Sequence, residues 1–293
     1  MMHTSSSRRA LACFVLLGGA GTATMAFADS PIKAEAGNGF TMSDPQGDDN
    51  GPGTYKYPTD KVYKAGSFDI TEFQVVPGKD TVEFRVKVAA KIEDPWDSKS
   101  WGGNGFSLQM VFIHIDTDHK AKSGVTDGVP GTNVRFAPKE AWDRVVIISP
   151  QGAPKLGAEI GLKAAAMQKN IIVPKTTSAS ENTLIAVVDT AQLGGPPKAT
   201  WGYQVLMQSN EGFADKKDLF TRKINESVGE HRFGGGSDYD NDPHVIDMFV
   251  PPEGDAAKKQ HEILSKYNQK ATDEVKPADL AVVPMVYPLA KRK

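Results

Sequence analysis

Thr81-Val-Glu-Phe-Arg-Val-Lys-Val88 alternates apolar and charged side chains from Val82 onward. In an extended chain, the apolar side chains of such a stretch point to one face and the charged ones to the other. This period predicts a β-strand with one buried face and one face in contact with solvent. The stretch therefore favours a protein built from sheets.

The same strand signal recurs along the rest of the chain. Leu108–Ile115 (LQMVFIHI) is apolar on both faces, which predicts a central strand that is covered on both sides. Further strands are predicted at Trp142–Ser149, Ile171–Val173, Leu184–Val188 and Trp201–Ser209. Clusters of Gly, Pro, Asn and Asp separate them. Many short strands at this spacing predict a mainly β protein that folds as a β-sandwich.

Two helices are also predicted. Asp255 is placed to cap a C-terminal α-helix that runs through Asn268, because apolar side chains recur on one face of this stretch. A second, shorter helix is predicted at Ala158–Met167. We expect the C-terminal helix to pack on the edge of the sandwich.

The N-terminus has the pattern of an export signal. Arg8 and Arg9 precede an apolar run, and Ala26-Phe27-Ala28 has the small-x-small pattern of a cleavage site. Residues 1–28 are therefore expected to be a signal peptide, and the protein is expected to be exported to the periplasm, the extracellular space or the cell surface. The two arginines leave general secretion and twin-arginine export both open. The apolar run is too short for an integral membrane protein.

The remaining chain is predicted to hold one domain. Residues 29–42 are expected to be a flexible lead-in, residues 43–270 a binding module, and residues 271–293 a C-terminal tail. Cleavage would remove Cys13, which is the only cysteine, so rigidity must come from a large core or from bound metal. Lys and Arg number 34 and Asp and Glu 36, and cleavage would remove two arginines. This acidic balance argues against nucleic acid or an anionic membrane as the main partner.

The run DPQGDDNGPGTYKYPTD at residues 44–60 concentrates carboxylates in a rigid loop. Asp44, Asp48 and Asp49 lie among prolines that fix the backbone and glycines that let carbonyl groups turn inward. Crowded carboxylates repel one another unless a cation neutralises them, and calcium accepts irregular oxygen geometry. The loop therefore predicts a calcium site. The alternative is that these aspartates only cap turns.

Two further acidic clusters are candidate calcium ligands. Asp116 and Asp118 directly follow the covered strand, and Asp238, Asp240 and Asp242 alternate in SDYDNDPHVID. The second cluster mimics the first ligand positions of an EF-hand. It has proline and phenylalanine where that motif needs its glycine and its final glutamate, so an EF-hand is excluded.

Exposed aromatic residues provide a candidate ligand face. Trp96 and Trp101 flank a polar loop, and Asn104 follows them. Indole rings stack on sugar rings, and neighbouring polar side chains can bind the sugar hydroxyls. The alternative for Trp96 is that it pins a long loop to the core.

The motifs of common enzyme classes are absent from the sequence. It has no GxSxG elbow, no HExxH helix, no phosphate-binding loop and no GxGxxG after a strand. Gly234-Gly235-Gly236 is predicted to form a tight bend. The carboxylates lie in turn motifs that suit cations, so we expect a protein that is not an enzyme.

Methionine and histidine in the predicted strands leave a second function open. Met110 and His114 lie on the covered strand, and Met207 lies in a later strand. Such side chains can be axial ligands of a b-type haem. Ordinary core packing is the alternative for each of them.

Several motifs together resemble one known family. They are the run at residues 44–60, DPW at Asp94–Trp96, IDTD at Ile115–Asp118, PGTN at Pro130–Asn133, WGYQVLMQSNEGF at Trp201–Phe213 and FGGG at Phe233–Gly236. In this order, over about residues 43 to 268, the chain resembles the C-terminal binding module of glucodextranases and related glucoamylases and pullulanases. The resemblance implies a β-sandwich like those of DOMON and family-9 carbohydrate-binding modules. Members of that wider group bind sugars or haem, and some bind structural calcium.

The expected function follows from these observations. We expect an exported, non-catalytic protein that binds a polysaccharide or a cell-envelope glycan and has calcium-stabilised loops. The alternative is a b-type haem-binding protein, or a structural subunit of an envelope or extracellular complex with a protein partner.

Overall fold

The computed structural model describes residues 1, 32–34, 39–237, 241–250, 255–270 and 275–288. The predicted signal peptide, apart from Met1, lies outside these residues. Asp238 and Asp240 of the predicted calcium cluster also lie outside them.

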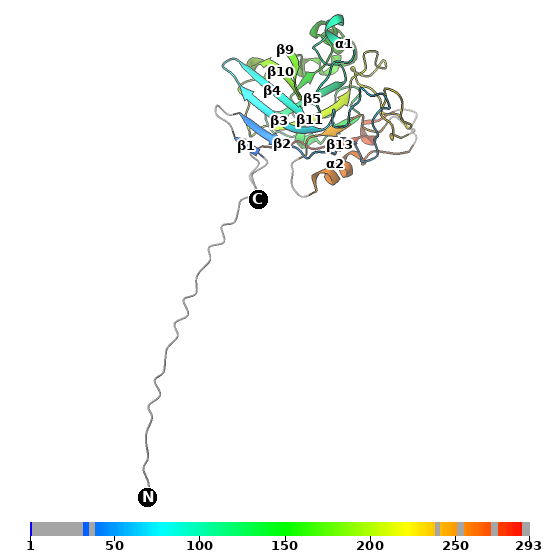
Figure 1. The fold of residues 1–293 in the computed structure, drawn as a ribbon. Helices are drawn as coiled ribbons and strands as arrows, with labels where there is room; N and C mark the ends of the chain where they lie inside the picture. The colour runs from blue at the N-terminus through cyan, green and yellow to red at the C-terminus, as the bar shows by residue number, and fades with distance from the viewer. Residues whose placement is uncertain (2–31, 35–38, 238–240, 251–254, 271–274, 289–293) are drawn as a thin grey trace. The chain divides into compact units, whose positions relative to one another are not determined.

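Two sheets form the framework of the protein (Figure 1). The first sheet is antiparallel, in the order β1-β2-β3-β4-β10-β9. Its strands are β1 (Ile32–Ala34), β2 (Phe40–Ser43), β3 (Ile70–Pro77), β4 (Thr81–Val88), β10 (Thr183–Asp189) and β9 (Thr176–Ser180). The second sheet has the order β12-β11-β5-β7-β8. Its strands are β12 (Asp247–Met248), β11 (Gly202–Ser209), β5 (Gln109–Asp116), β7 (Arg144–Ile148) and β8 (Ile171–Ile172).

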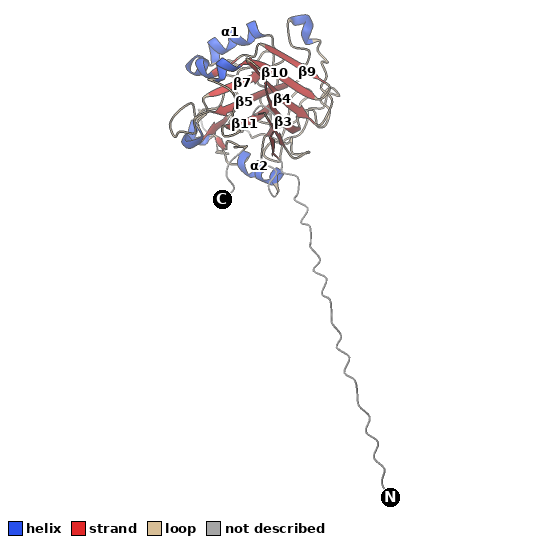
Figure 2. Cartoon of the chain, turned by 90° about the vertical axis from the view of Figure 1, so that its left-hand side faces the viewer, coloured by secondary structure: helices blue, strands red, loops and turns tan. Residues whose placement is uncertain are grey.

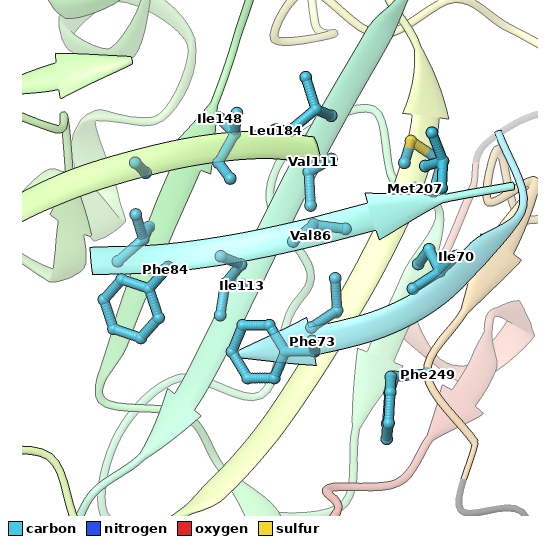
Figure 3. Packing of buried hydrophobic residues seen from close by; sticks show 14 of the residues in the cluster. Ile70, Phe73, Phe84, Val86, Val111, Ile113, Ile148, Leu184, Met207 and Phe249 are labelled. Atoms are coloured by element: carbon cyan, nitrogen blue, oxygen red, sulfur yellow. The ribbon is translucent and has the colours of Figure 1, made fainter. Parts of the chain in front are cut away.

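The alternation in β4 places its apolar side chains between the two sheets. Val82, Phe84, Val86 and Val88 are fully buried, and Lys87 is exposed. Figure 3 shows side chains of both sheets meeting in this core, which β4 and β3 line from one side and β5 and β11 from the other. The predicted β-sandwich is confirmed.

β5 is buried on both faces, as its sequence predicts. One face contributes Val111 and Ile113 to the core between the sheets. The other face contributes Met110 and Phe112 to a second apolar cluster, on the outer side of the second sheet. β5 therefore lies at the centre of the protein, and its C-terminal end carries Asp116.

Helices and a small third sheet cover the outer apolar cluster. They are α1 (Ala153–Lys163), α2 (Ala256–Leu264) and the parallel pair β6 (Val134–Phe136) and β13 (Ala281–Val283). Short 3-10 helices lie at Ser98–Trp101, Pro138–Glu140, Ala165–Asn170, Thr190–Leu193 and Pro277–Asp279. The two α-helices lie at opposite ends of the sandwich in both views (Figures 1 and 2).

The boundaries of both helices differ from the prediction. α1 begins at Ala153, which places Pro154 in the first turn, where proline is favoured, and it ends at Lys163. The predicted C-terminal part of this helix, up to Met167, belongs to a 3-10 helix. In α2, Asp255 is the cap, and its carboxylate accepts the N–H of Lys258 at 3.0 Å. This helix ends at Leu264, before the predicted end.

Two segments outside the predicted module contribute to the sandwich. Phe40 and Met42 lie in the expected lead-in, yet both are buried and belong to β2. In the expected tail, β13 pairs with β6, and Val286 exchanges backbone hydrogen bonds with Tyr203. The expected boundaries at residues 43 and 270 are therefore too narrow. Strand pairing with distant segments, which has no local signature, decides both ends.

No helix in the described part of the chain is long and apolar enough to cross a membrane.

Candidate functional site

Asp94 folds the loop that carries the two candidate tryptophans. Its carboxylate accepts the backbone N–H of Ser98 at 2.9 Å and the hydroxyl groups of Ser98 and Ser107. These bonds start the 3-10 helix at Ser98. At its other end, the indole N–H of Trp101 donates to the carbonyl of Trp96 at 3.2 Å. The two tryptophans are therefore fixed relative to each other.

Trp96 and Trp101 line one groove of about 500 Å³. Trp96 packs partly against the core, whereas Trp101 is 41% exposed. Phe213, from the loop after β11, is 96% exposed and forms another part of the lining. Trp101 and Phe213 therefore give the groove aromatic surface that is open to solvent.

Arg222 is the fixed cation of this groove. Its Nε lies 3.2 Å from a carboxylate oxygen of Glu211, and its Nη1 donates to the hydroxyl of Tyr63 at 3.0 Å. The same guanidinium donates to the carbonyl of His231 and stands 5.9 Å from the ring centroid of Trp96. Arg222 is buried, so these contacts hold the polar floor of the groove in one arrangement.

Lys155, from the first turn of α1, supplies a second cation. Its Nζ lies 5.8 Å from the ring centroid of Phe213 and 5.2 Å from that of Phe220. The groove therefore combines aromatic surface with charged groups at fixed positions, as sites for polar ring-shaped ligands do.

Asn104 is placed differently from the two tryptophans. Its side-chain amide donates to the carbonyls of Ser149 at 2.8 Å and Gln151 at 3.0 Å. It lines a separate hollow of about 220 Å³ with Leu156 and Val173. The structure brings Trp96 and Trp101 together, and it gives Asn104 the role of fastening the loop to the second sheet.

Sequence reasoning missed Glu211, Phe213 and Arg222. Glu211 and Phe213 lie in the NEGF sequence directly after β11, where an aromatic residue in a polar loop is a signal that could have been used. Arg222 carries no such signal. Only the fold places it against Trp96.

The acidic loop at residues 44–60 forms part of a buried carboxylate cluster. Asp44, Asp48 and Asp247 each offer an oxygen, and these oxygens all lie within 4.8 Å of one another. Asp44 follows β2 and Asp48 lies in the loop, whereas Asp247 begins β12 in the second sheet. We name these three residues the aspartate triad. Its members are at most 8% exposed.

Backbone N–H groups donate to one oxygen of Asp44 and to one oxygen of Asp247. Asp44 accepts the N–H of Val250 at 2.9 Å, and Asp247 accepts that of Ile70 at 2.6 Å. The neighbouring Asp69, which is also buried, accepts the N–H of Gly47 at 2.8 Å. The second oxygen of each of these carboxylates is buried without a hydrogen-bond partner in the described structure, as are both side-chain oxygens of Asp48.

The electrostatics of the cluster reflect this burial. Burial raises the pKa of Asp44 and Asp247 well above the usual range; the negative charge of Asp48 raises the pKa of Asp44 further, and that of Asp44 raises the pKa of Asp247. Burial, together with the charge of Asp49, raises the pKa of Asp48 to about 6 and that of Asp69 to about 7. These four carboxylates thus lie where negative charge is costly unless a cation or protons neutralise it.

Asp49 is not part of the triad, although the sequence predicts it as a calcium ligand with Asp44 and Asp48. Its carboxylate accepts the hydroxyl of Tyr57, whose ring packs against Phe68 and Phe233. Asp49 therefore anchors an aromatic cluster. Asp69 and Asp247, which were not predicted as ligands, take its place beside Asp44 and Asp48.

Asp116 and Asp118 form a second acidic cluster with Asp143. Asp116 is buried, and it accepts the hydroxyl of Tyr287 at 2.9 Å and the N–H of His119 at 2.7 Å. Asp118 and Asp143 likewise accept nearby N–H and hydroxyl groups. N–H and hydroxyl groups of the protein thus donate hydrogen bonds to all three carboxylates. This arrangement favours the alternative that these aspartates cap turns over a cation site.

Asp242 is the described member of the third predicted cluster. It is buried and lies 3.3 Å from the hydroxyl of Ser237. A further group that sequence reasoning did not single out is Asp60, Glu230 and His231, whose candidate ligand atoms also lie within 4.8 Å of one another. His231 also lines the groove, so this group shares one residue with it.

The candidate haem ligands lie on two faces of one sheet. Met110 and His114 belong to the face of β5 that carries the outer cluster, and His114 packs against Phe136 and Trp142. Met207 pairs with Val111 and points into the core between the sheets. All three candidates are fully buried in packed clusters. Met207 therefore cannot bind the same haem iron as Met110 or His114, because it lies on the opposite face of the sheet.

Comparison with known proteins gives one family. A family model described as the C-terminal binding module, SLH-like, of glucodextranase matches residues 40–280. No curated protein matches the chain. The matched range includes the groove and the aspartate triad, and it begins at Phe40, the first residue of β2.

Proposed function

The chain belongs to the family of the C-terminal, SLH-like binding module of glucodextranase, and from this premise we propose that it is an exported, non-catalytic protein that binds a polysaccharide or cell-envelope glycan. The family is one of binding modules, not of catalytic domains. The sequence-based expectation of a glycan ligand agrees with that class.

The observation that carries the proposal is the rigid aromatic surface of the groove. Trp101 is exposed, and its indole N–H is bound to the Trp96 carbonyl, so little side-chain entropy is lost when a sugar ring stacks on it. Phe213 extends the apolar surface, and Arg222 and Glu211 offer fixed polar atoms to hydroxyl groups. Apolar stacking with a few convergent polar groups is how proteins bind sugars.

The carboxylate of the groove supports a role in binding. Glycoside hydrolysis needs two carboxyl groups across the scissile bond, one of them free to donate a proton. Glu211 is the carboxylate of this lining, and it is paired with Arg222. A carboxylate held in place by a guanidinium is fitted to accept hydrogen bonds from ligand hydroxyl groups.

Export and calcium complete the proposal. The N-terminal signal pattern supports a periplasmic, extracellular or cell-surface location, where glycans are accessible. We infer that calcium is bound as a structural ion in the acidic loops, since buried carboxylates need neutralisation and calcium favours oxygen ligands. The packed surroundings of Met110, His114 and Met207 do not favour the haem alternative.

Affinity electrophoresis tests the proposal. Purified protein is run in gels that contain dextran, pullulan or solubilised cell-wall glycan. We expect one of these to retard the protein, and Trp101→Ala and Phe213→Ala each to weaken retention about tenfold, by loss of stacking area. Leu162→Ala, which removes an exposed apolar side chain of α1 outside the groove lining, is the matched control and should migrate like the wild type.

Three results would overturn this proposal. They are full retention by the Trp101→Ala, Phe213→Ala double variant, a Soret band in the purified protein, and migration unaffected by every glycan while a second protein co-purifies in fixed ratio. The last two would favour the haem-binding and structural-subunit alternatives.

A further inference from the structure

No basic side chain among the described residues forms an ion pair with the aspartate triad. None of the ion pairs of the described residues involves Asp44, Asp48, Asp247 or the neighbouring Asp69. Buried carboxylates are normally paired or bound to metal, because an isolated charge loses its hydration. A missing neutralising partner is therefore the first sign of a ligand at this place.

The second sign is the set of buried oxygens without a partner. Asp44 and Asp247 each use one oxygen for a backbone N–H and leave the other free. Asp48 is fully buried and leaves both free. The oxygens that the triad offers lie within 4.8 Å of one another, so they surround a common point. Protein interiors rarely leave so many acceptors unused.

We propose that Asp44, Asp48 and Asp247 bind one calcium ion between the two sheets. The neighbouring Asp69 adds negative charge at the edge of this calcium site. The inference rests on the structural calcium of the proposed function, and it assigns that ion to one site and to ligands from both sheets. It does not depend on glycan binding.

The surrounding structure suits an ion that holds elements together. Asp44 follows a strand of the first sheet, Asp247 begins a strand of the second, and Asp48 lies in the loop between β2 and β3. Gln260 of α2 donates to the carbonyl of Asp48 and accepts the N–H of Met248 at 3.0 Å. An ion bound here would join two sheets, one loop and, through Gln260, the C-terminal helix.

Calcium is favoured over other ions by the ligands. All of the side chains are carboxylates, and none is the thiolate or imidazole that zinc and copper prefer. Magnesium usually keeps several waters, which a fully buried site does not supply. The competing explanation is that protons neutralise the carboxylates.

Calorimetry on the folded protein tests the assignment. Protein that has been treated with a chelator and dialysed is titrated with calcium chloride, and its melting temperature is measured with and without calcium. We expect one ion per chain and a rise in melting temperature of about 5 to 10 °C at free calcium 100-fold above Kd.

Two variants that each remove one negative charge distinguish loss of a calcium ligand from a general loss of acidity. One is in β12 and the other is in the acidic loop. Asp247→Asn should lower calcium affinity at least tenfold. It should also melt at a higher temperature than the wild type in chelator, because one repelling charge is gone. Asp49→Asn also removes one negative charge, from the residue next to Asp48, but the Asp49 carboxylate accepts a hydrogen bond from Tyr57 and is not a proposed ligand. It should keep affinity within about threefold.

The outcomes are distinct. Absence of calcium binding to the wild type, with an unchanged melting temperature, would mean that protons neutralise the triad. Equal loss in Asp49→Asn and Asp247→Asn would overturn the ligand set. Stoichiometric, tight binding in Asp247→Asn would place calcium elsewhere, which refutes this site and leaves the structural calcium of the proposed function standing. If Asp247→Asn does not fold, Asp48→Asn provides the same comparison.

Discussion

Asp44 and Asp247 bridge the two sheets in opposite directions. Asp44, which follows the first sheet's β2, accepts the N–H of Val250 at 2.9 Å beyond the end of β12. Asp247, in the second sheet's β12, accepts the N–H of Ile70 at 2.6 Å at the start of β3. The two carboxylates therefore close one end of the sandwich, and each keeps one buried oxygen without a hydrogen-bond partner in the described structure.

Removal of calcium should loosen this end of the sandwich first. We expect chelation to speed amide hydrogen exchange at Ile70 and Val250 about tenfold or more, because repulsion in the triad opposes both hydrogen bonds. The ladder between β4 and β10, in which Phe84 pairs with Ala186, should be unaffected and serves as the internal control. Exchange measured by NMR or mass spectrometry checks this. A uniform change across both sheets would contradict it.

Gly51 is required where the acidic loop passes Tyr55. Its φ is +58°, and a Cβ there would lie 2.3 Å from the Tyr55 ring. We expect Gly51→Ala to lower the free energy of unfolding by about 2 to 4 kcal/mol, through the left-handed backbone and the clash. Gly157→Ala in α1, where nothing lies within 4 Å of the added Cβ, should instead stabilise by about 0.5 to 1 kcal/mol. Urea unfolding compares the two, and equal effects would count against this explanation.

Arg222 should matter for both stability and ligand binding. Arg222→Met removes the partner of the largely buried Glu211 and the donor to Tyr63, so we expect a loss of about 2 to 3 kcal/mol in unfolding free energy and weaker glycan retention. Arg232 also approaches Glu211, at 3.5 Å, but is 41% exposed. Arg232→Met should cost less than about 0.5 kcal/mol. Comparable losses in both variants would show that burial of the pair is not the cause.

His114 should make the protein sensitive to acid. Burial lowers the pKa of His114 to about 3, and the Gln204 backbone opposes this in part. The unfolded state binds a proton near pH 6.5 whereas the folded state does not, so this contribution to stability is complete above pH 6.5 and is lost as the pH falls towards 3. Relative to the wild type, His114→Leu should gain about 2 to 3 kcal/mol between pH 7 and pH 4.5.

Unfolding curves of both proteins at the two pH values, in saturating calcium, give this difference. The titration of the carboxylates is common to both proteins and cancels. If the difference between the two proteins is the same at both pH values, His114 does not titrate as its burial implies.

Much of the framework could be predicted from local pattern. β4 alternates because one of its faces contacts solvent, and β5 is continuously apolar because both of its faces are buried. Trp96 and Trp101 could be paired because a short loop separates them. β9 was not predicted, since this edge strand is polar and its residues are half or fully exposed. β13 was not predicted either, because its partner β6 lies far away in the sequence.

The candidate sites show the same division. The sequence alone determined that the loop at residues 44–60 concentrates carboxylates, and that Trp101 lies in an exposed polar segment. Only the tertiary structure decided that Asp247 joins Asp44 and Asp48, that Asp49 serves Tyr57, and that Arg222 meets Trp96. The physical reason is that periodicity and turn chemistry act over a few residues. The convergence of side chains depends on strand pairing and sheet packing, which here join an aspartate to an amide 206 residues away.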